Sequence, residues 1–429
     1  MNVRLEPSVL TGTVPAIPSK SDVHRLLFCA AQADAPVTLQ LDTDALSEDI
    51  QTTLGVIETL GAGVVVAPGS ITVTPAAAVS EEPLFDCKES GSTLRFLLPV
   101  AARLCRRPSF TGSGRLPERP IGDLLDALAS NGVSASSDRL PLQLSGTLRS
   151  GVYELPGNVS SQYITGLLLA LPALEGDSEI RLTTELQSSP YIDITIHALR
   201  RFGVRIDLLH NGWHVPGGQT FRSPGTLSAD GDWSGATFFL CAGALGKEPV
   251  TVSGLSPDSP QGDKNVLRVL RGFGAKYAPR PDENRTMAIT VQPSPLSGTA
   301  VDVTDIPDAF PMLAVLAAFA EGRTTFTGGA RLRLKESDRI ASVKAMLEAL
   351  GGKAEETPDG LIVCGTEETG GLKGGTVDAC NDHRIVMAAA IAAMNASGPV
   401  TILGAEAVRK SYPNFMEELT RLGGTVHGI

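Results

Sequence analysis

The stretch LEALGGKAEETPDGLIVCG (residues 347–365) contains the pattern that decides the fold. Its first five residues, LEALG, are typical of the end of an amphipathic helix, where glycine takes the left-handed backbone conformation that follows the C-cap. The next residues form two runs that favour strands, and the Pro-Asp-Gly between them favours a tight turn. The stretch therefore predicts a helix that leads into a β-hairpin.

The same helix end recurs along the whole chain, as IETLG, LASNG, LRRFG, LRGFG, LEALG and LTRLG. Successive motifs are 71, 71, 71, 77 and 72 residues apart, measured between their last residues, Gly61, Gly132, Gly203, Gly274, Gly351 and Gly423. A fixed period of this kind is the signature of an internal repeat. We therefore predict an α/β fold built from six repeats of a βαβαββ-type unit.

A second set of helices runs in step with the first and is far more apolar. These helices are predicted to begin near residues 20, 91, 160, 232, 308 and 382. Their bodies are apolar on nearly all sides, so we expect them to be buried. Their first turns are polar, small or charged, and this has two interpretations. The side chains can simply cap the helix N–H groups, or several helix starts can together form an anion-binding site.

The ends of the chain suggest how the repeats divide into domains. The sixth repeat stops before its last strands, and residues 3–21 resemble residues 142–161, so the N-terminus can supply those strands. We predict one domain from residues 19–226 and a second from residues 1–18 and 227–429, with three repeats in each. The chain would then cross twice, near residues 18 and 226, and these hinge segments would border a cleft.

The composition excludes several classes of function. A formal net charge of −11 argues against non-specific nucleic-acid binding. The longest apolar runs are too short to span a bilayer, and the N-terminus has no apolar signal core. Phosphate-loop, Rossmann and metal-ligand spacings do not occur in the sequence, so we expect no cofactor and no metal. Six scattered cysteines without a CxxC pair favour reduced thiols, and we expect a soluble, cytoplasmic monomer.

Clustered cations stand out against this acidic background. RLRLKESDR (331–339) places Lys335 and Arg339 where they either repel each other on one helix face or oppose the helix macrodipole. The cluster is either a solvated surface or an anion site. The cations at this and the other motif sites are Lys20, Arg25, Arg119, Lys335, Arg339, Arg384 and Lys410. Asp308 and Glu336 are acidic exceptions suited to proton transfer. The residues thus indicate a cleft for phosphorylated, carboxylated small molecules.

Nine motifs, in order, resemble the 5-enolpyruvylshikimate-3-phosphate synthase family over nearly the whole chain. They are PSKSDVHR, SGSTLRFLLP, LPERPIGDL, SSQYITGLLLALP, SSPYIDIT, IPDAFP, RLRLKESDR, NDHRIVMA and VRKSYPNF. The resemblance implies a two-domain inside-out α/β barrel, the enolpyruvyl transferase fold. It also implies transfer of the enolpyruvyl group of phosphoenolpyruvate to the 5-hydroxyl of shikimate 3-phosphate, by addition and elimination with release of phosphate. This reaction leads to chorismate and aromatic amino acids, and the family is the target of glyphosate.

The resemblance also implies roles for individual residues. It implies that Asp308 takes the hydroxyl proton, and that Glu336, with Lys20, delivers a proton to the methylene carbon. The implied shikimate 3-phosphate ligands are Lys20, Ser21, Arg25, Ser160, Ser161, Gln162, Ser188, Asp308 and Lys335. The implied phosphoenolpyruvate ligands are Lys20, Gly91, Arg119, Gln162, Arg339, Arg384 and Lys410.

Two positions depart from the family pattern, and two other functions compete. Glu89 stands where many members have asparagine, and Arg331 stands where members have a substrate-binding asparagine. The nearest rival activity is UDP-N-acetylglucosamine enolpyruvyl transfer, whose family carries a loop cysteine that GRLPERP (114–120) lacks. The rival from another class is a non-catalytic repeat protein with capped helices.

Overall fold

The computed structural model describes residues 1–44 and 46–428; Ala45 and Ile429, the last residue of the second predicted domain, lie outside the described residues. The chain folds into two compact units. The middle unit is Lys20–Ala229, and the terminal unit combines Met1–Ser19 with Asp230–Ile429. Each unit has its own hydrophobic core.

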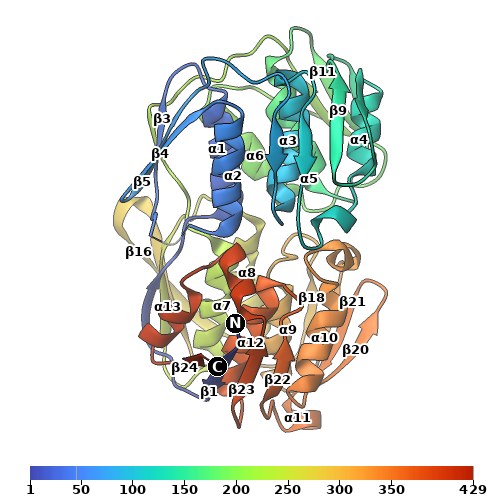
Figure 1. Ribbon diagram of the computed structural model, residues 1–429. Helices are drawn as coiled ribbons and strands as arrows, with labels where there is room; N and C mark the ends of the chain where they lie inside the picture. The colour runs from blue at the N-terminus through green and yellow to red at the C-terminus, as the bar shows by residue number, and fades with distance from the viewer. Residues whose placement is uncertain (45, 429) are drawn as a thin grey trace. The chain divides into compact units, whose positions relative to one another are not determined.

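The middle unit is built around three buried helices that pack against one another, as Figure 1 shows for its blue and cyan segments. These are α1 (Lys20–Ala31), α3 (Gly91–Leu104) and α5 (Ser161–Ala170). Their amphipathic partners are α2 (Glu48–Thr59), α4 (Gly122–Ala129) and α6 (Ser189–Arg201). The three sheets, in spatial order, are β14 (Thr226–Ser228), β3 (Val37–Gln40), β5 (Ser70–Thr74), β4 (Gly63–Ala67); β6 (Leu84–Asp86), β7 (Ser109–Thr111), β9 (Leu142–Gly146), β8 (Val133–Ala135); and β10 (Val152–Leu155), β11 (Ser178–Leu182), β13 (Gly212–Val215), β12 (Asp207–Leu209).

The terminal unit repeats this plan. Its mutually packed buried helices are α7 (Trp233–Leu245), α9 (Phe310–Phe319) and α12 (His383–Asn395), and its other helices are α8 (Val266–Gly272), α10 (Arg339–Ala349), α11 (Thr366–Thr369) and α13 (Phe415–Arg421). The sheets are β2 (Gly12–Pro15), β15 (Val250–Leu255), β17 (Met287–Gln292), β16 (Lys276–Pro281); β18 (Ala300–Asp302), β19 (Arg323–Thr327), β21 (Gly360–Cys364), β20 (Lys353–Thr357); and β22 (Gly375–Asp378), β23 (Val400–Leu403), β1 (Val3–Glu6), β24 (Thr425–Gly428).

The strands of the described residues form six four-stranded sheets with one shared topology. In each sheet the first two strands are parallel, and the third is antiparallel to both the second and the fourth. Buried helices lie inside each unit and sheets lie outside. This confirms the predicted α/β fold of six repeats.

The N-terminal segment completes the sheets of the terminal unit. Strand β1 lies between β23 and β24, with Val3 opposite Ile402 and Leu5 opposite Val426. Strand β2 then pairs in parallel with β15. Because Val3 and Leu5 alternate with exposed or half-exposed residues, their side chains reach the core while the strand closes the sheet.

The repeated glycines end their helices as the sequence predicts. All six have positive φ, from 74° at Gly203 to 109° at Gly423, which is the conformation that glycine adopts at low cost. At Gly61 a Cβ atom would also lie 2.5 Å from the carbonyl oxygen of Ala78. A side chain at this position would therefore strain both the backbone and the packing.

One predicted helix start is wrong by two residues. The helix expected from residue 308 begins at Phe310, after Ala309 as its N-cap, with Pro311 in the first turn. Proline is favoured there because its missing N–H is not needed. Asp308 is consequently outside the helix. Among the described residues, every helix is too short or too polar to traverse a lipid bilayer.

Candidate active site

Arg339 is the centre of a charge network in the terminal unit. It is the first residue of α10, and its side chain is 1% exposed. Its guanidinium donates from Nη1 to Asp308 at 2.7 Å, from Nη2 to Glu336 at 2.8 Å and from Nε to Asp382 at 2.9 Å. A buried cation needs partners of this kind. The network places two predicted catalytic acids, Asp308 and Glu336, on one predicted substrate-binding arginine.

Asp308 also contacts a second arginine, because Arg384 Nη2 lies 3.3 Å from its other carboxyl oxygen. Burial by itself favours the protonated acid, but Arg384, Lys335 and Arg339 outweigh that effect and hold the pKa of Asp308 well below its usual range. The carboxylate is therefore ionised at neutral pH. It is also a weak base as long as these cations are not neutralised by another anion.

Lys335 resolves the puzzle of the RLRLKESDR cluster. Residues Ala330–Leu334 form a short 3₁₀ helix, Lys335 follows it in extended conformation, and α10 begins only at Arg339. The two cations therefore do not share a helix face. Burial, with Arg339 and Arg331 adding to it, lowers the pKa of Lys335 to about 8, although Asp308 and Glu336 oppose the shift. An incoming anion would stabilise this charge.

The ends of the same segment are held by specific contacts. Asp338 caps α10 by accepting from the backbone N–H of Ala341, and Ser337 donates to Asp382 at 3.0 Å. Arg331, at the departure from the family pattern, is 8% exposed and donates from Nη2 to the carbonyl of Thr304 at 2.8 Å. Its guanidinium is thus directed in part at the protein backbone.

Lys410 ends a 3₁₀ helix (Ala405–Lys410) and is 7% exposed. Its Nζ donates to the carbonyl of Asn381 at 2.8 Å. Both Asn381 and Cys380 have positive φ, 53° and 49°, which is uncommon for residues with side chains. This backbone directs the Asn381 carbonyl at Lys410, directly before the start of α12.

In the middle unit, the predicted shikimate 3-phosphate residues lie at the starts of three helices. Lys20 and Ser21 begin α1, Ser160, Ser161 and Gln162 begin α5, and Ser188 is the N-cap of α6, with φ of 55°. Helix starts offer unpaired N–H groups to an anion. Lys20 itself pairs with Asp49 at 2.7 Å.

Arg25 ties these helix starts together. It is 2% exposed and donates to the carbonyl of Ser21 at 2.6 Å, to the carbonyl of Tyr191 at 2.8 Å and to the hydroxyl of Thr195 at 2.7 Å. Burial lowers its pKa to about 10. Because these contacts join α1 to α6, the structure gives Arg25 a positioning role beside its predicted ligand role.

A second group of predicted residues gathers where α3 begins. A Cβ atom at Gly91 would lie 2.6 Å from Nη1 of Arg119 and 2.6 Å from Nη1 of Arg95. Arg95 also donates to Gln162 at 3.0 Å, and Gln162 donates to Ser92 at 2.9 Å. The structure thus brings Gly91, Arg119 and Gln162 together, as expected for residues that share one ligand.

Sequence reasoning missed three residues of these networks: Asp49, Arg95 and Asp382. Arg95 gave a signal, because a cation in the middle of an apolar helix needs a buried partner. Asp382 also gave one, since an aspartate before an apolar helix is a common N-cap, and it does accept from the N–H of Arg384 at 2.9 Å. Its second contact, with Arg339, is tertiary. Asp49 gave no signal.

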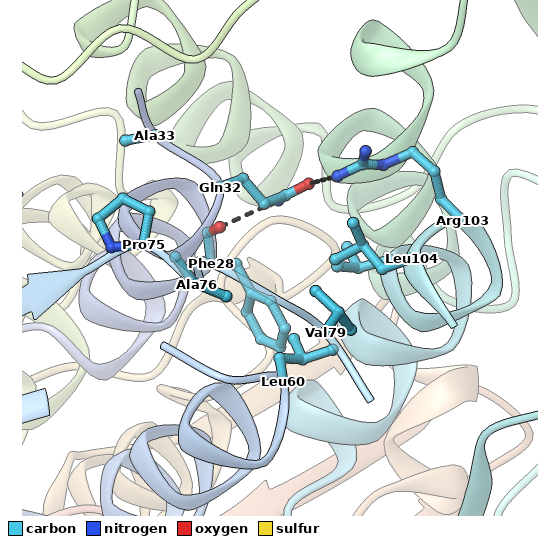
Figure 2. A pocket seen from close by; sticks show the side chains of 11 residues that line it. Phe28, Gln32, Ala33, Leu60, Pro75, Ala76, Val79, Arg103 and Leu104 are labelled. Carbon is cyan, nitrogen blue, oxygen red and sulfur yellow. Dashed lines mark hydrogen bonds between the residues drawn. The ribbon is translucent and has the colours of Figure 1, made fainter. Parts of the chain in front are cut away.

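A cavity in the middle unit lies apart from these residues. It has a volume of about 200 Å³, and Figure 2 shows Phe28, Leu60, Val79 and Leu104 around it, with Gln32 accepting a hydrogen bond from Arg103. Phe28 and Gln32 belong to the C-terminal end of α1 and the residue after it, whereas Lys20 and Ser21 begin the helix. The cavity is therefore not part of the predicted site.

The chain matches the family model described as EPSP synthase (3-phosphoshikimate 1-carboxyvinyltransferase) over residues 5–419. It is 40% identical to the 3-phosphoshikimate 1-carboxyvinyltransferase of Clostridium kluyveri, covering 99% of this chain and 98% of the relative. The Halobacterium salinarum protein of the same name is 39% identical, with both chains fully covered.

Solved structures give the same picture. An EPSP synthase from Acinetobacter baumannii superposes with a TM-score of 0.81 at 26% identity, with both chains fully covered. The enolpyruvyl transferase NikO from Streptomyces tendae superposes with a TM-score of 0.78 at 20% identity, covering 99% of this chain and 98% of that one. The second likeness concerns the fold alone.

Proposed function

The chain belongs to the EPSP synthase family, and from this premise we propose which of its residues carry the reaction. The protein is a 3-phosphoshikimate 1-carboxyvinyltransferase of the shikimate pathway: it transfers the enolpyruvyl group of phosphoenolpyruvate to the 5-hydroxyl of shikimate 3-phosphate and releases phosphate. One observation carries the residue assignment. Asp308 lies against both Arg339 and Arg384, so the proposed base and two proposed anion-binding groups form one cluster.

We propose that the two units contribute to the same pair of substrates. In the middle unit, Lys20, Ser21, Arg25 and the first residues of α5 and α6 bind shikimate 3-phosphate, and Gly91, Arg119 and Gln162 bind phosphoenolpyruvate. In the terminal unit, Lys335 binds shikimate 3-phosphate, and Arg339, Arg384 and Lys410 bind phosphoenolpyruvate. Arginine suits these ligands because its planar guanidinium matches carboxylate and phosphate oxygens in pairs.

Substrate binding activates the base in this proposal. The anionic phosphoenolpyruvate replaces Asp308 as a partner of Arg339 and Arg384, so the cations no longer depress the pKa of the carboxyl group. Asp308 then accepts the proton of the 5-hydroxyl as the oxygen attacks the central carbon of the enolpyruvyl group. Because the same cations hold the donor, the base gains strength only when the donor is bound.

The remaining proton transfers fall to Glu336, with Lys20. A proton from one of these groups reaches the methylene carbon, which becomes a methyl group in the tetrahedral intermediate. Phosphate then leaves, and the methyl group returns a proton, which restores the carbon–carbon double bond. Glu336 is fixed for this task by its 2.8 Å contact with Arg339. Holding two polyanions together with fixed cations supplies both positioning and charge stabilisation.

Phosphate release from shikimate 3-phosphate and phosphoenolpyruvate measures this activity directly. We expect turnover with this pair and none when UDP-N-acetylglucosamine replaces shikimate 3-phosphate. Turnover with the UDP-sugar alone would instead support the rival transferase. Absence of turnover with either acceptor, together with no binding of either phosphate ester, would support the non-catalytic repeat protein.

The Gly91→Ala variant is expected to raise KM for phosphoenolpyruvate by about ten-fold, with a smaller change in KM for shikimate 3-phosphate. The added Cβ would stand 2.6 Å from the Arg119 and Arg95 guanidinium groups, so both must move. A shift of a bidentate partner costs on the order of 1.5 kcal/mol. Steady-state kinetics measures the two KM values.

The matched control is Gly55→Ala, in helix α2 of the same unit, where a Cβ atom would have no neighbour within 4 Å. This variant should keep both KM values. An unchanged KM for phosphoenolpyruvate in Gly91→Ala would remove Gly91 and Arg119 from the proposed donor site.

We also propose a monomer in the cytoplasm. All six cysteines are free thiols, which fits a reducing compartment. Light scattering should give a mass near the chain mass of 44.8 kDa, and a mass of twice that value would contradict the monomer.

A further inference from the structure

Asp263 is a buried carboxyl group that the proposed reaction leaves without a role. It lies in a short 3₁₀ helix (Gly262–Asn265) of the terminal unit and is 3% exposed. Its Oδ2 accepts a hydrogen bond of 2.6 Å from the hydroxyl of Ser234. Its Oδ1 is buried and has no hydrogen-bond partner among the residues that the structure describes. Burying a carboxylate with one oxygen unsatisfied is costly, so the position calls for an explanation.

The surroundings of Arg384 provide one. The Arg384 guanidinium lies over the ring of Phe238, one helical turn beyond Ser234 in α7, at 5.8 Å from the ring centre. Three carboxyl groups act on its charge: Asp308, which is in direct contact, and Asp232 and Asp263. Its Nε is buried and has no hydrogen-bond partner within the described part of the chain.

We propose that Asp263 is a positioning residue that sets how tightly Arg384 holds phosphoenolpyruvate, by presenting a second carboxyl group to that guanidinium beside Asp308. This inference rests on the proposed role of Arg384 as a donor ligand. When Asp263 is neutral, Arg384 has less negative charge near it and attracts the donor more strongly. When Asp263 is ionised, it competes with the donor for the same cation.

The surrounding groups place this change near neutral pH. Burial and the negative charge of Asp308 raise the pKa of Asp263 to about 7, with a smaller contribution from Asp232, while Ser234 and Arg384 oppose the rise. Lys264, next to it, is directed elsewhere and donates to the carbonyl of Ser259 at 2.8 Å. Near pH 7 both forms of Asp263 are therefore populated.

Linkage gives the sign of the effect. An anion bound at Arg384 adds negative charge close to Asp263, which raises its pKa further, so binding takes up protons near pH 7. Conversely, deprotonation of Asp263 weakens anion binding. KM for phosphoenolpyruvate should therefore rise as the pH rises through about 7.

The first test compares the native enzyme with Asp263→Asn, which keeps the shape of the neutral acid. From pH 6 to pH 8, KM for phosphoenolpyruvate should rise at least about five-fold more in the native enzyme than in the variant. The variant should keep most of kcat, because Asp263 acts on donor affinity. Phosphoenolpyruvate titrates in both proteins alike, so the difference isolates Asp263.

A second test does not depend on turnover. Sulfate, which does not titrate near pH 7, is added to enzyme saturated with shikimate 3-phosphate, and calorimetry at pH 7.0 in buffers of different ionisation enthalpy counts the protons taken up. The native enzyme should take up a fraction of a proton, and Asp263→Asn should take up close to none. Lys335 contributes equally to both proteins.

Ser234→Ala is the second variant. It removes the hydrogen bond that favours ionised Asp263, so the rise in KM should move to higher pH. Equal proton uptake and parallel KM profiles in the native enzyme and in both variants would overturn the inference, while turnover would leave the proposed function standing. If the native enzyme lacks turnover, the proposed function fails, and the sulfate measurement still decides whether Asp263 is coupled to an anion at Arg384.

Discussion

The Asp308→Asn variant is expected to lose about 10³-fold in kcat while its KM for phosphoenolpyruvate stays the same or falls. Asparagine keeps the size of the side chain but cannot accept the 5-hydroxyl proton. It also removes the carboxylate that pairs with Arg339 and Arg384 at 2.7 and 3.3 Å, so these arginines become more available to the donor. Steady-state kinetics, with both substrates varied, measures the split between kcat and KM.

Asp305→Asn serves as the control, because Asp305 is an exposed aspartate in the same loop. It should retain near-native kcat and KM. If Asp308→Asn also keeps near-native kcat, Asp308 is not the base. If it loses kcat only through a large rise in both KM values, its role is to organise the arginines and not to accept a proton.

The largest effect on stability is expected from Arg339→Met. Methionine leaves Asp308, Glu336 and Asp382 without the cation that they share, and Asp382 is 0% exposed. Removing one member of a buried ion pair typically costs about 3–5 kcal/mol of folding free energy. Urea unfolding, followed by circular dichroism, measures the loss in free energy of unfolding.

The same variant has a predicted pH dependence. Asp308 has a folded-state pKa below its ordinary value of 3.8, so its ionised form stabilises the native enzyme above that pH, and the contribution disappears as the pH falls through the folded-state value. The stability difference between native enzyme and Arg339→Met should therefore be greatest near neutral pH and should shrink in acid.

Arg333→Met provides the comparison within the same stretch. Arg333 pairs with Asp338 at 3.0 Å and Glu356 at 3.1 Å, but its side chain is 30% exposed. Solvent screens such pairs, so the loss should stay within about 1 kcal/mol. A loss for Arg339→Met as small as that for Arg333→Met would show that the buried network contributes little to stability.

The repeat architecture could be read from the sequence because it is encoded locally. Each glycine after a helix reports a left-handed backbone position, and each all-round apolar segment reports a buried helix. These signals depend on neighbours within one or two turns, so Gly351 predicts its helix end without knowledge of the rest of the chain. The start of α9 was misplaced because Asp308 resembles a helix cap, whereas Pro311 and Ala309 determine where the helix begins.

The sequence motifs also identified the residues of the site, but not their pairing. Lys335 and Arg339 looked like two cations in conflict on one helix face. In the structure the chain is non-helical at Lys335, and Arg339 is compensated by three carboxylates. The family resemblance supplied ligand roles, yet it gave no reason to expect that the proposed base is already paired with the arginines of the donor site.

By itself, the sequence determined the six repeats, the buried helices and the set of charged residues at their starts, since periodicity and backbone preference act over short stretches. Only the tertiary structure decided which charges meet. Asp308 and Arg384 are 76 residues apart in the chain but 3.3 Å apart in space, and Asp263 acquires its raised pKa from burial and from Asp308. Electrostatic interactions depend on distance and on exclusion of water, and both are set by packing between segments that are remote in sequence.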